Sequence, residues 1–271
     1  MSDEPDTPFD LGALAPTERP SDPTRTPAAK LELPKRFYTA VATAEGPEGH
    51  ALRLDGKPVR TPARHLLTVP TTGLAAVLAA EWAAQGTHIN PATMPLTRLL
   101  NAALDGVAGE IEAVRADVVA FAGSDLLCYR PDAPEGLVAR TNALWNPVID
   151  WAERDLGARM VLAEGVMPVD QDPAAMARIA AAVPAGPPLL VAATHVLTTL
   201  TGSALLALAI VHGALDFETA WSAANVDEDW NWSLWGADAE ALARRGARTA
   251  DARTAALVVA ELTAAGDAPP A

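Results

Sequence analysis

The stretch LDGKPVRTPARHLLTVPTTGLAAVLAAEWAAQG, residues 54–86, contains the change from strand to helix that sets the fold class. Its first half has short β-favouring runs around Asp55-Gly56, a dipeptide typical of a two-residue hairpin turn. Its second half has apolar residues at helical spacing between Leu74 and Trp82. We therefore expect a sheet that contains a hairpin and is followed directly by a helix.

Before this stretch, the composition of the chain changes near residue 35. Residues 1–34 are rich in proline and acids and poor in apolar side chains, so we expect a disordered tail. From Arg36 onward, the runs RFYTAVAT and HALRL favour strands. At the other end of the chain, residues 265–271 again have the composition of a tail.

The chain after residue 86 is rich in alanine, leucine and valine, and the first two favour helix. Apolar stripes at helical spacing recur along it. We therefore predict an α+β fold with two domains. A small N-terminal domain with a β-sheet and helices covers residues 35–123, and a larger, mainly helical, bundle-like domain covers residues 124–264.

Residues 189–211, LLVAATHVLTTLTGSALLALAIV, contain no acid, lysine or arginine. Their length could span a bilayer. However, His195, Gly202, Ser203 and several threonines dilute the run, and no basic flank or aromatic belt sets an orientation. We favour a helix at the centre of a bundle and keep a membrane-associated adaptor as an alternative.

The net charge of −14 argues against two classes of partner. A strongly acidic protein repels nucleic-acid phosphates and anionic membrane surfaces, whereas it attracts a basic protein surface. Cys128 is the single cysteine, and the five histidines show no ligand spacing. The sequence has no phosphate loop, dinucleotide fingerprint or nucleophile elbow. We expect no metal, no cofactor and no catalytic residue.

The segment VDEDWNWSLWGADAE, residues 226–240, carries three of the seven tryptophans together with five carboxylates. Indoles among acids suggest a docking surface or the seam between a core and water. A continuous helical register places Trp221, Trp232 and Trp235 on one stripe that should pack inward, which leaves Trp230 and the acids for the surface. An enzyme that uses paired acids of this cluster is an alternative.

The presence of an acid at residue 240 can be explained by interactions within its own helix. Glu240 lies in the first turn of the last predicted helix, where the helix dipole favours an acid, and four residues before Arg244. Spacing alone therefore favours a capping and pairing role over contact with a partner.

Several motifs together resemble a known family. They are RFY (36–38), LDGKPVRTPARHLLTVPT (54–71), NPATMPLTRL (90–99), WNPVIDWAERDLGARM (145–160) and DEDWNWSLWGADAE (227–240). In combination they are similar to the "ATP-twelve" family, the assembly chaperones of the F-type ATP synthase. The resemblance covers the chain from about residue 35 to about residue 262.

The resemblance implies a non-enzymatic chaperone with an N-terminal α+β domain and a C-terminal helical domain. Such a protein binds the unassembled α subunit of the soluble catalytic head and prevents its aggregation until the α/β ring forms. The family needs no nucleotide or metal, and the acid that matches Glu240 is essential in it. The candidate partner-binding residues are Glu240, Asp238, Trp235, Trp230, Asp227 and Asp229.

The N-terminus, MSDEPDTPFD, is acidic and has no apolar run, so it does not fit a secretory signal or a mitochondrial presequence. We expect a bacterial cytoplasmic protein, with the mitochondrial matrix as the other home of the family, and we expect a monomer.

Overall fold

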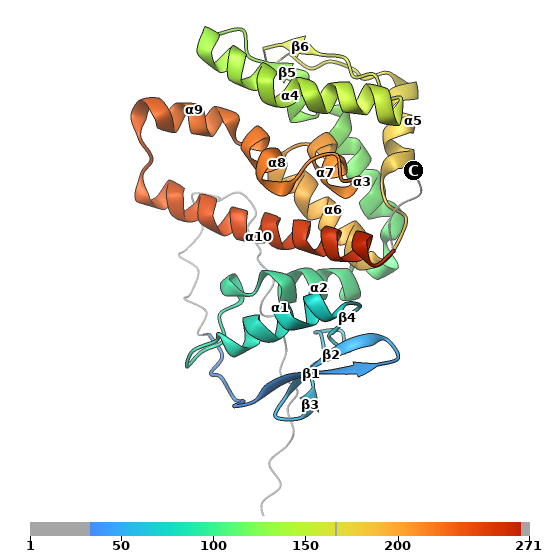
Figure 1. Cartoon of the computed structure of the whole chain (residues 1–271), viewed down its shortest axis with the longest axis vertical. Helices are drawn as coiled ribbons and strands as arrows, with labels where there is room; N and C mark the ends of the chain where they lie inside the picture. The colour runs from blue at the N-terminus through green and yellow to red at the C-terminus, as the bar shows by residue number, and fades with distance from the viewer. Residues whose placement is uncertain (1–32, 166, 267–271) are drawn as a thin grey trace, which may run out of the picture. The chain divides into compact units, whose positions relative to one another are not determined.

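The computed structural model describes residues 33–165 and 167–266 (Figure 1). The tails predicted for residues 1–34 and 265–271 lie almost entirely outside these ranges. The described chain forms two compact units, one ending at Asp105 and the other beginning at Gly106. A small antiparallel sheet precedes a mainly helical region, so the predicted α+β fold class is confirmed.

The first unit is built on a four-stranded antiparallel sheet. Its strands are β1 (Val41–Gly46), β2 (Gly49–Leu54), β3 (Lys57–Pro58) and β4 (Thr68–Val69). Strand β2 pairs with all three others. Asp55 and Gly56 join β2 to β3 with φ values of 47° and 82°, as a hairpin turn with two left-handed residues requires. The hairpin predicted at this dipeptide is confirmed.

Two helices complete the first unit: α1 (Thr72–Ala83) and α2 (Pro95–Asp105), with the short 3-10 turn η2 (Pro91–Thr93) between them. Helix α1 packs on β1 and β2 through an apolar face that includes the fully buried Trp82. Glu81 accepts hydrogen bonds from the backbone N–H groups of Leu96 and Thr97, at 2.6 and 2.9 Å. One carboxylate of α1 therefore satisfies the free amides at the start of α2.

The second unit begins earlier than the predicted boundary at residue 123. Helix α3 (Ile111–Gly123), placed in the N-terminal domain by its position in the sequence, packs against α5 and α6 and belongs to the helical unit. The partner of its apolar stripe lies far along the chain, and no local pattern could identify it.

The helical unit contains eight α-helices and a two-stranded parallel sheet in its described residues. After α3 come the 3-10 turn η4 (Leu126–Cys128), β5 (Tyr129–Arg130), α4 (Glu135–Leu156), β6 (Ala163–Glu164), α5 (Pro173–Ala182), α6 (Pro188–Thr201), α7 (Ala204–Val211), α8 (Phe217–Ala224), α9 (Val226–Trp235) and α10 (Ala239–Ala264). The 3-10 turn η3 (Val107–Gly109) precedes α3. Helix α6 packs against α3, α7 and α10, which makes it the centre of the unit.

The apolar run 189–211 forms two buried helices, and its polar residues explain why. Gly202 ends α6 with a φ of 69°, and the Ser203 hydroxyl caps α7 by accepting the Leu206 N–H. Within α6, buried threonines donate to carbonyls one turn earlier, as Thr198 does to Thr194 at 2.9 Å. Among the described residues, no helix combines the length and hydropathy that a membrane span needs.

A buried carboxylate holds the break between α6 and α7 in place. Asp125 accepts the Leu127 N–H and the Leu205 N–H, both at 3.0 Å, and thereby caps η4 and supports the start of α7. Its side chain is completely buried, and this desolvation raises the pKa of Asp125 to about 6.

Candidate functional site

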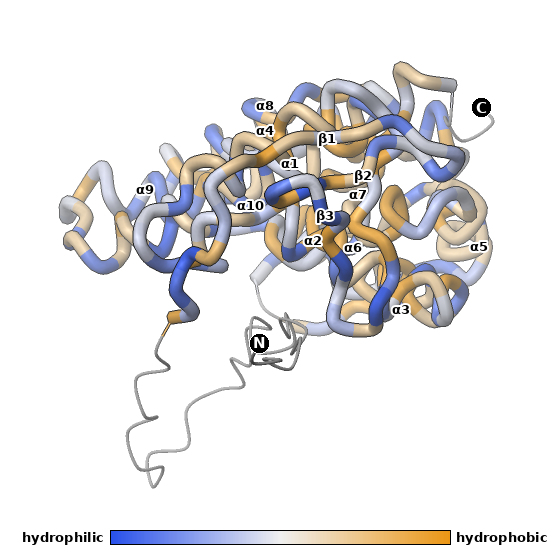
Figure 2. The backbone as a smooth tube through the Cα atoms, turned by 90° about the horizontal axis from the view of Figure 1, so that it is seen from below, coloured by the Kyte–Doolittle hydropathy of each residue, from blue (hydrophilic) through white to orange (hydrophobic). Residues whose placement is uncertain are grey.

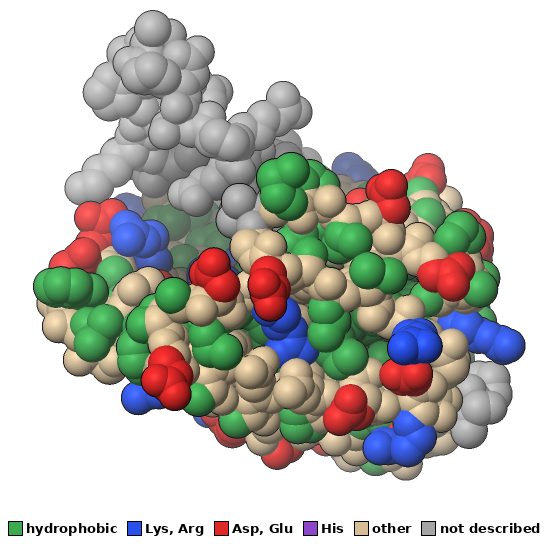
Figure 3. Space-filling view, turned by 90° about the horizontal axis from the view of Figure 1, so that it is seen from above, with side chains coloured by type: hydrophobic (Ala, Val, Ile, Leu, Met, Phe, Trp, Pro, Cys, Tyr) green, Lys and Arg blue, Asp and Glu red, His purple; other side chains and the backbone are tan. Residues whose placement is uncertain are grey.

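Helices α9 and α10 form a hairpin whose turn exposes large apolar side chains. Gly236, with a φ of 78°, ends α9 and directs the chain into α10. Leu234, Trp235 and Leu242 have exposed fractions of 53%, 82% and 51%. We call these three residues the α9–α10 tip. Hydrophobic side chains gather at the left edge of Figure 3, the side on which the turn between these helices lies in Figure 1.

Two acids lie beside this apolar surface. Asp238 caps α10, because its carboxylate accepts the Ala241 N–H at 2.7 Å. Glu240 is 82% exposed at its side chain and pairs with Arg244 at 2.6 Å. The local contacts predicted for Glu240, the first turn of a helix and a partner four residues on, are thus present.

The other predicted acids lie further along α9. Asp229 binds Arg245 at 3.0 Å, and Glu228 binds the same guanidinium. Asp227 is eight residues before Trp235, about 12 Å along a helix axis. Desolvation raises the pKa of Asp227. Of the six candidate residues, the structure therefore brings only Trp235, Asp238 and Glu240 together at the tip.

This arrangement does not resemble a pair of catalytic carboxylates. Glu228 and Asp229 face a shared guanidinium, Asp238 faces backbone, and Glu240 faces Arg244. In the described part of the segment, none of these four acids faces another across a cleft. Among the described residues, no group of three or more His, Cys, Asp or Glu could hold a metal ion.

The predicted roles of two tryptophans are reversed in the structure. Trp235, expected to pack inward, is the most exposed large apolar side chain among the described residues. Trp230, expected at the surface, packs against α4, where Arg140 lies 4.9 Å from the centre of its ring. The stripe predicted from Trp221 to Trp235 is interrupted at Asn225, between α8 and α9. Trp235 is the last residue of α9, a helix in which only Val226 is buried, so it lies beyond the core.

Three residues of this region were not identified from the sequence. Leu234 and Leu242 were missed because a leucine near a helix end is ordinarily part of a core. Arg245 was missed because its partner Glu228 is 17 positions away, outside any helical pairing rule. The clustering of indoles and acids was the available signal for the region, but it did not assign the individual residues.

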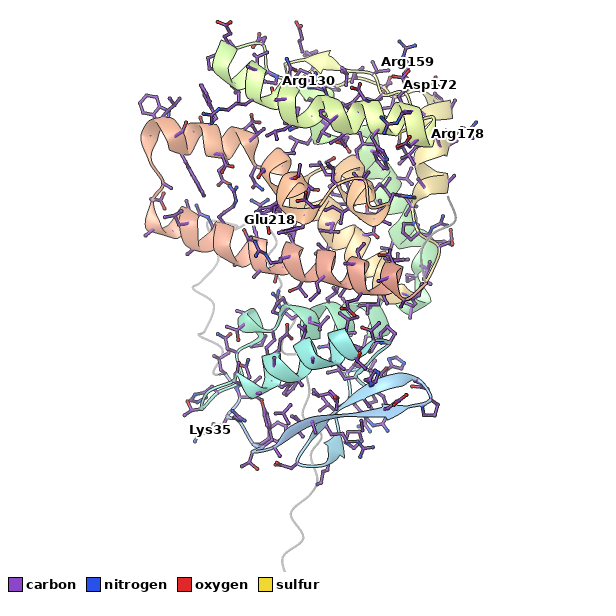
Figure 4. The ribbon with its side chains drawn as sticks, viewed as in Figure 1. Lys35, Arg130, Arg159, Asp172, Arg178 and Glu218 are labelled. Atoms are coloured by element: carbon purple, nitrogen blue, oxygen red, sulfur yellow. The ribbon has the colours of Figure 1, made fainter. Side chains whose placement is uncertain are left out.

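An apolar groove of about 690 Å³ lies elsewhere in the helical unit, between α10 and the connection from α7 to α8. Its lining includes Leu215, Phe217 and Leu257. Glu218 pairs with Arg253 at 2.9 Å on its wall, and Figure 4 shows Glu218 between α8 and α10. None of the residues of the α9–α10 tip lines this groove, so the two features are separate.

Comparison with known proteins places these observations in a family. Residues 35–153 match the family model described as ATP12 chaperone protein. The chain is 49% identical to the Atu1473 protein, a putative chaperone from Agrobacterium tumefaciens, with a TM-score of 0.79. That match covers 85% of this chain and 87% of the other.

Two solved structures from Paracoccus denitrificans give similar matches. Atp12 and a point mutant of Atp12p are each 39% identical to this chain, with a TM-score of 0.75, and each match covers 84% of this chain and 97% of the other. The resemblance inferred from the sequence motifs is confirmed, and the chain belongs to the ATP12 chaperone family.

Proposed function

We propose that this chain is an assembly chaperone of the F-type ATP synthase that binds the unassembled α subunit of the catalytic head. In this proposal it covers apolar surface on α and so prevents aggregation until the α/β ring forms. Membership of the ATP12 chaperone family supports the general role, and α as the specific client is our inference.

The observation that carries the proposal is the α9–α10 tip. Large exposed apolar side chains are costly in water and are typical of surfaces that bind another protein. An indole supplies a large contact area with few rotatable bonds, so that little entropy is lost when it docks. Trp235, which is 82% exposed, is therefore our principal contact residue, flanked by Leu234 and Leu242.

The acids around the tip support a client with a basic contact surface. Asp238 and Glu240 lie beside the apolar residues, and the whole chain carries a net charge of −14. Such a field accelerates encounter with a basic surface and opposes self-association of the chaperone. We propose Glu240 and Asp238 as rim contacts and a monomer as the working form. Asp227, Asp229 and Trp230 have a supporting role, because they lie away from the tip.

We place this activity in the bacterial cytoplasm, where the subunits of the catalytic head would meet. Catalysis and a cofactor play no part in the proposal, because covering apolar surface needs neither.

The direct test is suppression of aggregation. Purified α subunit is diluted from denaturant with and without this chain, and light scattering is followed over time. We expect the scattering of α to fall as the chain approaches an equimolar ratio, while isolated β subunit gains less protection. Unchanged scattering of α with excess chain would overturn the proposal.

A further inference from the structure

Few side chains of α9 reach the apolar core. Among the residues of α9, all of which are described, only Val226 at its start is buried. In α10, likewise described throughout, the first buried residue is Ala252. Figure 2 shows the difference in colour, since α9 is largely blue and pale whereas α7 is orange. Besides the packing of Trp230 on α4, the outer parts of both helices therefore need a further means of support.

Arg245 of α10 supplies contacts of the required kind. Its side chain is only 13% exposed, and its guanidinium donates to Glu228 and to Asp229 of α9. The same guanidinium lies 5.0 Å from the ring centre of Trp232 and 5.9 Å from that of Trp221. One side chain thus contacts α8 and three positions on α9.

The chemistry of arginine suits this role better than that of lysine. A planar guanidinium can bind two carboxylates at its edge while its face lies over an aromatic ring. Two anions around one cation also compensate the loss of its hydration. A lysine ammonium would keep the charge but lose the planar fork and the stacking face.

We infer that Arg245 is a positioning residue for the docking surface: it fixes α9 against α10 so that the α9–α10 tip stays open to a client. This inference rests on the proposed function. Trp235 follows Trp232 by three residues, about one helical turn, so a fixed Trp232 determines where Trp235 points. When the contacts of Arg245 are lost, α9 samples other orientations. The apparent affinity for the client then falls with the fraction of molecules in which the α9–α10 tip is correctly oriented.

The test compares Arg245→Gln with Arg253→Gln in the full chain. Arg253 is a control on the same helix: its side chain is 60% exposed, it pairs with Glu218 at 2.9 Å and it lies over the Phe217 ring at 5.4 Å. It supports α8 and not α9. We measure affinity for purified α subunit, amide hydrogen exchange resolved by helix, and thermal unfolding.

We expect Arg245→Gln to weaken binding of α at least tenfold and to speed amide exchange in α9, with exchange in α6 and α7 unchanged. Arg253→Gln should bind within about twofold of wild type. Arg245→Lys should fall between wild type and Arg245→Gln. A purely structural role in overall stability would instead speed exchange in α6 and α7 as well.

The outcomes separate the inference from the proposed function. If Arg245→Gln speeds exchange in α9 but binds α as tightly as wild type, the inference is wrong. If Arg245→Gln unfolds as a whole, the double variant Glu228→Gln/Asp229→Asn removes the same ion pairs by changing the carboxylates. Binding of α by this double variant with wild-type affinity would also overturn the inference. If wild type itself does not bind α, the proposed function fails. Independently of that result, unchanged amide exchange in α9 of Arg245→Gln would contradict the positioning role of Arg245.

Discussion

The indole of Trp230 in α9 packs so closely against Gly136 in α4 that a Cβ at residue 136 would lie 2.6 Å from its Cη2 atom. Two non-bonded carbon atoms do not approach this closely, and the rigid indole ring cannot bend away from an added Cβ. The pair therefore joins α9 to α4, on a different side of α9 from the one that Arg245 contacts.

Gly136→Ala should displace Trp230 and loosen α9. The forced contact should cost about 1–3 kcal/mol, as overpacking does, and part of the interaction with Arg140 should be lost. Tryptophan emission should shift to the red, and urea unfolding should show the loss of stability. The control is Gly246→Ala in α10, where a Cβ meets nothing within 4 Å and alanine should stabilise the helix by up to about 1 kcal/mol. Equal effects from the two changes would contradict the close packing of Trp230.

Asp238 combines a structural role with a proposed contact, and two substitutions separate them. Asp238→Ala removes the cap of α10 and should cost about 1 kcal/mol of stability. Asp238→Asn keeps an accepting oxygen for the Ala241 N–H and should cost little, but it removes the charge. We predict that the Asn variant unfolds in urea as wild type does and binds α subunit more weakly at low salt. A stability loss as large as that of the Ala variant would show that the charge, and not the cap, supports the helix.

Glu240→Lys should weaken binding of α subunit with only a small loss of stability. The side chain is 82% exposed and pairs with the neighbouring Arg244 on the same helix, so the fold depends little on it. Glu112→Lys is the matched control, because Glu112 is 80% exposed, lies in the first turn of α3 and pairs with Arg115 at 2.8 Å. Binding and thermal unfolding are measured for both variants. If the melting temperature and the affinity of Glu240→Lys fall together, Glu240 acts through the fold and not through contact.

The buried Asp125 predicts an unusual dependence of stability on pH. Burial raises its pKa from 3.8 to about 6, so between these values the folded state holds a proton that the unfolded state releases. The contribution of Asp125 is therefore favourable at low pH and is lost as pH rises from about 4 to about 6. A rise of the pKa from 3.8 to about 6 corresponds to about 3 kcal/mol.

Comparison with Asp125→Asn isolates this effect. Some other carboxylates titrate in the opposite sense, since hydrogen bonds lower the pKa of Asp55 and of Asp216. The difference between the unfolding free energies of wild type and variant removes their contribution. We predict that wild type loses about 3 kcal/mol of stability relative to Asp125→Asn as the pH rises from 4 to 7. A difference that does not change with pH would show that Asp125 is not the group responsible.

The sequence predicted those features that depend on local chemistry. Asp55-Gly56 specifies a hairpin because two left-handed residues are needed there, and the structure has that hairpin. The motifs of the family were recognisable because they combine such turns with fixed spacing. The segment 226–240 was singled out because indoles and carboxylates seldom alternate in a core, and its role as a docking surface stays a prediction.

The sequence could not predict features that depend on contacts between distant segments. Trp235 is exposed because it ends α9 beyond the core, and Trp230 packs against Gly136, more than ninety residues earlier in the chain. Helix α3 joined the helical unit because its partners α5 and α6 come later. Arg245 meets Glu228 only once α9 and α10 fold back on each other.

The most direct measurement is the affinity of purified α subunit for wild-type chain and for Trp235→Ser, a change at a side chain that is 82% exposed. Leu257→Ser, at the groove residue with an exposed fraction of 36%, is the control for loss of a surface apolar side chain. We predict that wild type and Leu257→Ser bind α with similar affinity, and that Trp235→Ser binds at least tenfold more weakly with unchanged thermal stability. Equal binding of α by wild type and Trp235→Ser would contradict the assignment of the α9–α10 tip as the docking surface.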